Sequence, residues 1–107
     1  MMAHAISVHE IRAKLEETIG PVFYSDLRAH IARGGLLLVD PALLLIDAGL
    51  AIAMDDSVKV TQWLGKGWLR RPSEAEVTSW SQSPERRWLA IVVQPYALVQ
   101  EMDSRGT

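Results

Sequence analysis

The chain has 107 residues, of which 49% are hydrophobic, and it carries a formal net charge of −2 with no cysteine. This length predicts one domain with a core of its own, and the hydrophobic fraction excludes a disordered chain. The missing cysteines exclude a disulfide framework, thiolate zinc sites and cysteine nucleophiles. The slight acidity argues against binding nucleic acid through a large basic surface.

Two amphipathic helices are predicted in the first third of the chain. The first follows a capping box, in which the Ser7 hydroxyl accepts from a helical N–H and Glu10 reaches back to the Ser7 backbone. Gly20-Pro21 ends this helix. The second helix begins at Ser25 and stops at Gly34-Gly35, where glycine adopts a left-handed C-cap without steric cost.

The most apolar part of the chain lies in its middle. Leu36–Val39 is too short for a helix between its glycines and Asp-Pro, so we predict a buried strand. Residues 43–54 predict a third helix that is apolar nearly all round and therefore buried. A membrane span here would have to bury Asp40 and Asp47 and to contain Pro41, so we expect none.

Two further helices are predicted in the second half. Asp55-Asp56-Ser57 indicates a turn and N-cap, and the helix that follows ends at Gly65-Lys66-Gly67. Trp68–Arg71 predicts a short strand. Ser73 and Glu76 then form a second capping box that opens the fifth helix. The residues expected to point inward from these two helices are Val60, Trp63, Leu64, Val77 and Trp80.

The C-terminal part predicts one more helical turn at Ser83-Pro84 and strands at about 89–94 and 97–100, separated by Pro95. Together the elements predict an α+β fold, with about five helices packed on a small sheet of three to four short strands. We expect a single domain over residues 1–107, with frayed tails at 1–6 and 101–107. Residues 1–17 contain no apolar signal-peptide core, so we expect a cytoplasmic protein.

Four segments of the chain carry a family resemblance: LLLVDP (36–41), AIAMDD (51–56), WL (63–64) followed by GWLRRPS (67–73), and AIVVQPYALVQ (90–100). They resemble a bacterial family of short proteins, the domain of unknown function DUF2288. The chain differs from the family pattern at two positions, because the pattern has an acidic residue where this chain has Leu44 and a tryptophan where it has Tyr96. The resemblance implies a bacterial origin and a small soluble protein, and it supplies no activity.

Signals for catalysis are weak. The chain contains no nucleophile elbow, P-loop or dinucleotide-binding fingerprint, and we predict no cofactor and no metal. Asp47 lies in the most apolar stretch, and a buried carboxylate there could act as a general acid or base. The alternative is an aspartate on the exposed rim of the helix, so an enzyme is our third interpretation. Asp55 and Asp56 could bind a cation, although Asp-Asp-Ser before a helix favours capping.

Residues 50–71 resemble a helix-turn-helix, in which small apolar residues, a tight polar turn and a second helix follow one another. Asp55 and Asp56 stand where a recognition helix would approach phosphates, and a net charge of −2 weakens the attraction. DNA binding is therefore the second interpretation, with nucleic acid a partner that the charge disfavours. The side chains that would contact it are Lys59, Gln62, Lys66, Arg70 and Arg71.

All four tryptophans lie in the C-terminal half of the chain. Trp68 and Tyr96 stand next to strand ends, and aromatic side chains often anchor protein interfaces. An exposed edge strand near Pro95 could pair with a second copy of the chain. The first interpretation is therefore a non-catalytic interaction or regulatory module of the bacterial cytoplasm, with a protein partner or a homodimer. The alternative is that all four tryptophans pack in the core.

Overall fold

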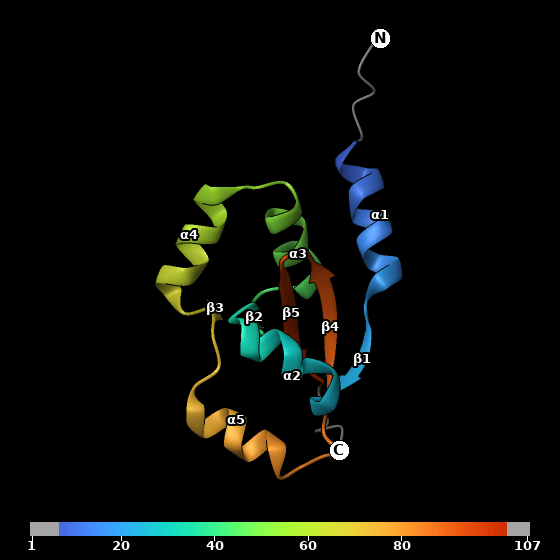
Figure 1. Ribbon diagram of the computed structural model, residues 1–107. Coiled ribbons are helices and arrows are strands. Elements are labelled where there is room, and N and C mark those ends of the chain that lie inside the picture. Colours follow the sequence, from blue (N-terminus) through green and yellow to red (C-terminus); the bar gives the residue numbers. More distant parts are fainter. Residues whose placement is uncertain (1–6, 103–107) are drawn as a thin grey trace.

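The computed structural model describes residues 7–102, which contain five helices and five strands (Figure 1). The helices are α1 (Val8–Thr18), α2 (Tyr24–Arg33), α3 (Leu45–Ala53), α4 (Ser57–Lys66) and α5 (Glu74–Ser81). The strands are β1 (Gly20–Phe23), β2 (Leu36–Val39), β3 (Leu69–Arg70), β4 (Arg87–Val93) and β5 (Tyr96–Glu101). The expected tails lie outside the described residues apart from Glu101, which pairs with Trp88, and Met102.

The strands form one mixed sheet in the order β1-β4-β5-β2-β3. β2 and β5 run parallel, and the other neighbouring strands run antiparallel. β4 and β5 form a hairpin in which Val93 pairs with Tyr96 around a turn of Gln94 and Pro95, whose peptide bond is cis. The hairpin therefore occupies the middle of the sheet, and β1 and β3 form its edges.

The α+β class is confirmed, but the sheet has five strands where three to four were predicted. The missed strand is β1. Gly20-Pro21 follows the end of α1 as predicted, and the same two residues begin β1. Proline lacks the N–H that a central strand would need, but an edge strand tolerates it because one side of its backbone has no partner strand.

Successive side chains of β2 point to opposite faces of the sheet, so the hydrophobic core is divided between the two faces. Leu37 and Val39 pack with α3 and with partly buried side chains of α1 and α4. Leu36 and Leu38 pack with α2 and with Trp80 of α5. Helices α1, α3 and α4 therefore cover one face, and α2 and α5 cover the other. All four residues of β2 are buried because both of its faces are covered.

Local capping chemistry sets several helix ends as predicted. The Glu10 N–H donates to Ser7 Oγ at the start of α1, and the Glu76 N–H donates to Ser73 Oγ at the start of α5, each at 3.1 Å. Both glutamates also accept from the cap backbone, which completes the two capping boxes. Left-handed glycines close α2 and α4: Gly34 with φ +74° and Gly67 with φ +77°.

Two local predictions were wrong. The segment at Ser83-Pro84 is a turn instead of a helix, and the Arg86 N–H donates to the Ser83 carbonyl oxygen at 3.0 Å. Helix α3 also begins later than predicted. Before it, Asp40 Oδ1 accepts from the Ala42 N–H at 2.8 Å, so this stretch is held as a turn.

Candidate binding groove beside α4

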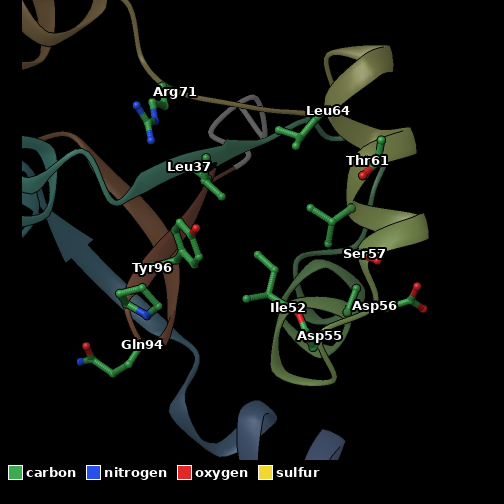
Figure 2. Close-up of a pocket in the computed structure, with 13 residues that line it drawn as sticks. Leu37, Ile52, Asp55, Asp56, Ser57, Thr61, Leu64, Arg71, Gln94 and Tyr96 are labelled. Atoms are coloured by element: carbon green, nitrogen blue, oxygen red, sulfur yellow. The ribbon is translucent and has the colours of Figure 1, made fainter.

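A pocket of about 760 Å³ lies between α4, the C-terminal end of α3, and the sheet at the β4–β5 turn (Figure 2). Its size is within the range of ligand-binding pockets in proteins, and most of its lining is apolar. We call it the α4 groove. The lining residues are Leu37, Ala51, Ile52, Asp55, Asp56, Ser57, Val60, Thr61, Leu64, Arg71, Gln94, Pro95 and Tyr96.

Helix periodicity builds one wall of the α4 groove. Ser57, Val60, Thr61 and Leu64 follow the spacing that places residues along one face of a helix, and all four line the groove. Figure 2 shows Thr61 and Leu64 on α4 across the groove from Leu37 and Tyr96 of the sheet. Leu64 was expected to point into the core. Its side chain is instead 49% exposed, at the rim of the groove.

The opposite wall comes from the sheet. Leu37 lies in β2, and Tyr96 is the first residue of β5, directly after the tight turn at Gln94 and Pro95. Tyr96 also packs against the core on the α3 side of the sheet, so its ring is held in place. Its side chain makes no hydrogen bond to any described residue, which leaves a polar group at the groove surface.

The α4 groove has opposite charges at its two ends. Figure 2 shows Arg71 at one end and Asp55 and Asp56 at the other, with the apolar side chains between them. Asp56 caps α4 by accepting from the Lys59 N–H at 3.2 Å, whereas Asp55 sits in the α3–α4 turn with φ +56°. Among residues 7–102, neither Arg71 nor Asp55 takes part in an ion pair.

The two predicted interface residues lie in different environments. Tyr96 lines the α4 groove, whereas Trp68 does not. Trp68 packs partly against the core and carries the Lys66 ammonium over its ring, 4.6 Å from the centroid. The predicted edge strand near Pro95 was wrong, because both strands of that hairpin have neighbours on each side. Pairing with a second copy would have to use β1 or β3 instead.

The five predicted nucleic-acid contacts do not form one free basic surface. Arg70 donates from both terminal nitrogens to the Glu76 carboxylate, each at 2.8 Å. Lys59 Nζ lies 3.9 Å from Asp56 Oδ2. Arg71 lines the α4 groove. The remaining two are exposed on α4: Gln62 and Lys66. α3 and α4 do form consecutive helices joined by a short turn, as a helix-turn-helix requires.

Asp47 lies on the exposed rim of α3, which was the alternative interpretation. Its side chain is 40% exposed, and Arg12 Nη1 donates to Asp47 Oδ1 at 3.0 Å. Asp47 does not line the α4 groove. An ion pair between two helices explains this carboxylate without a catalytic role. In the part of the chain that the structure describes, no cluster of acidic or histidine side chains could hold a metal ion.

Residues 10–101 match the family described as Protein of unknown function (DUF2288). The chain belongs to this family. The sequence resemblance is thus confirmed, and it comes with no activity. Among solved structures, this DUF2288 protein is similar to the NMR solution structure of PA1075 from Pseudomonas aeruginosa, at 34% identity and a TM-score of 0.74. That match covers 89% of this chain and 87% of the other. No curated protein matches.

None of the helices within residues 7–102 is both long and apolar enough to cross a lipid bilayer.

The Arg70–Glu76 pair predicts a pH-dependent contribution to stability. The hydrogen bonds from Arg70, joined by one from the Ser73 N–H, lower the pKa of Glu76 from 4.5 to about 2. Because the folded-state pKa is depressed, the stabilisation is present above about pH 4.5 and is lost as the pH falls towards 2. The pair is partly exposed, so solvent screening reduces its contribution to about 1 kcal/mol.

Glu76→Gln isolates this charge, because glutamine keeps the capping-box geometry. We expect the variant to lose about 1 kcal/mol of unfolding free energy at pH 7 and to approach the wild type as the pH falls below 3. Urea denaturation at a series of pH values measures the difference. A constant difference across that range would contradict the assignment.

Proposed function

We propose that this protein is a non-catalytic binding module of the bacterial cytoplasm, which docks a segment of a partner protein in the α4 groove. The observation that carries the proposal is an open groove with a mostly apolar lining, which reaches the half-exposed Leu64 at its rim. Exposed apolar surface of this kind marks interaction sites in soluble proteins. Of seven large hydrophobic side chains exposed among residues 7–102, three lie on or next to α4: Met54, Val58 and Leu64.

A protein segment suits this groove better than a small substrate does. The apolar lining reaches the half-exposed Leu64 at the rim. Met54 and Val58 do not line the groove, but they add exposed apolar side chains to the end of α3 and to α4. Partner helices and strands are held in such grooves mainly by their apolar side chains. No two of the titratable side chains that line the groove are hydrogen-bonded to each other: Asp55, Asp56, Arg71 and Tyr96.

DNA binding through α4 remains the second candidate, favoured by the two consecutive helices and by the exposed Gln62 and Lys66. Three features oppose it. Asp55 and Asp56 lie at the start of α4, Arg70 is engaged by Glu76, and the net charge is −2. Phosphate binding needs uncompensated cations, and the described surface of α4 offers few of them.

Site-specific photocrosslinking in the cells that express the protein tests the proposal. A benzophenone side chain at Thr61 lies in the groove, and one at Thr78, exposed on α5, is the control. We expect Thr61 to give a defined protein adduct that survives nuclease treatment and is absent from Thr78. A nucleic-acid adduct would instead support the second candidate, and an adduct with this chain itself would identify a homodimer.

Leu64→Glu should abolish the Thr61 adduct, because it places a carboxylate at the apolar rim. Leu64 is 49% exposed, so the change should alter the unfolding free energy by less than about 1 kcal/mol. Leu44→Glu is the matched control, since Leu44 is 61% exposed and lies outside the groove. The proposal fails if both variants keep the adduct or if both lose it.

A further inference from the structure

The charges at the two ends of the α4 groove restrict which partner segment it can hold. Resting on the proposed function, we infer that this segment is apolar in its middle, acidic where it meets Arg71, and basic where it meets Asp55. Leu37, Ile52 and Leu64 line the groove between those ends (Figure 2) and would contact the apolar residues of the segment.

The Arg71 guanidinium is placed to receive a carboxylate. It lies beside Gly34 at the C-terminal end of α2, and a Cβ at that glycine would be 3.9 Å from Arg71 Nη1. The negative end of the α2 dipole favours a cation there. Arg70, the preceding residue, already has a bidentate carboxylate partner in Glu76, whereas Arg71 has none among residues 7–102. An arginine with no partner at the end of an apolar groove favours a planar anion.

The other end of the groove favours a cation. Asp56 is engaged with Lys59 through the helix cap and a 3.9 Å ion pair, so Asp55 is the carboxylate available to a ligand. An anion at this end would be repelled by both aspartates. Opposite charges at the two ends of one groove therefore fix the direction in which a segment binds.

One polar side chain on the sheet wall completes the site. Tyr96 lines the groove, and its hydroxyl is not hydrogen-bonded to a described residue. It can bond the backbone of a bound segment, which apolar side chains cannot do. The groove thus offers apolar contact, a hydrogen-bonding hydroxyl and two oriented charges to a single peptide.

Selection from a displayed library of random peptides tests this inference without knowledge of the natural partner. We expect the enriched peptides to share an apolar stretch with an acidic residue on one side and a basic residue on the other. Binding of a synthetic peptide with that consensus should weaken about tenfold or more in Arg71→Glu, since a charge-assisted hydrogen-bonded pair is lost and replaced by repulsion. Replacing the acidic residue of the peptide by lysine should restore binding to Arg71→Glu.

Arg28→Glu is the control, because Arg28 is an exposed arginine on α2 that does not line the α4 groove. Its affinity for the peptide should match the wild type, and circular dichroism melting should show that both variants are folded. Two results would overturn this inference but leave the proposed function standing. One is a set of enriched peptides whose acidic and basic residues show no fixed order, and the other is an unchanged affinity of Arg71→Glu for the peptide. The proposed function itself would be overturned if no peptide were enriched, or if the enriched peptides still bound Leu64→Glu.

Discussion

Gly35→Ala is expected to destabilise the protein by about 1–3 kcal/mol, because there is no room for a methyl group at this position. A Cβ on Gly35 would lie 2.8 Å from the carbonyl oxygen of Pro95, which is backbone and cannot swing aside as a side chain would. Gly35 cannot move away either, since its own carbonyl oxygen accepts from the Ala97 N–H at 2.9 Å where β2 meets β5. Urea denaturation followed by tryptophan fluorescence measures the loss.

Gly65→Ala is the matched control. Gly65 lies inside α4, and a Cβ there would meet no atom within 4 Å. Alanine in a helix interior is favoured over glycine, so this variant should gain about 0.5–1 kcal/mol. An unfolding free energy for Gly35→Ala equal to that of the wild type would show that the contact between the start of β2 and the β4–β5 turn is looser than the structure describes.

The elements that the sequence predicted well are those whose ends depend on local chemistry. A serine followed by a glutamate three residues later caps a helix wherever it occurs, and Gly34 and Gly67 supply the left-handed residues that end one. Strand β1 escaped prediction because Gly20-Pro21 is a helix terminator as well as a tolerated start for an edge strand. Only the pairing of β1 with β4, some seventy residues later, decides between these roles.

The candidate site was predicted in pieces. Tyr96 was expected to lie in a protein interface, and Arg71 was expected to contact nucleic acid. Tyr96 begins β5 and Arg71 directly follows β3, and folding brings both residues to one groove. Leu64 was expected in the core, since it shares a helical face with Val60. Periodicity identifies that face but cannot tell a side chain packed on the sheet from one at the rim of a groove. That distinction depends on how far α4 stands from β2 and β5.

The largest effect of a single substitution is expected at Trp88, on the sheet face that α2 and α5 cover. Trp88 is 0% exposed and meets Trp80 of α5 in an edge-to-face pair with centroids 5.0 Å apart. It also pairs with Val22 on β1 and with Glu101 on β5, so its ring lies where three strands and a helix meet. Trp88→Ala should cost about 3–5 kcal/mol. For a domain of this size that is a large part of the total stability, about 5–15 kcal/mol.

Trp88→Phe separates ring packing from hydrogen bonding. Trp88 Nε1 is buried and has no acceptor among the described residues, so phenylalanine loses no hydrogen bond and keeps an aromatic edge against Trp80. Trp88→Phe should lower the unfolding free energy by about 1–2 kcal/mol, well below the loss expected for Trp88→Ala.

Unfolding in urea followed by far-UV circular dichroism is the suitable measurement, because both substitutions remove a fluorophore. Val92→Ala is the control, since Val92 lies on the same strand but is 45% exposed. The expectation is contradicted if the phenylalanine variant loses as much unfolding free energy as the alanine variant. The indole N–H would then have an acceptor, and a polar contact would stabilise this side of the core in addition to packing.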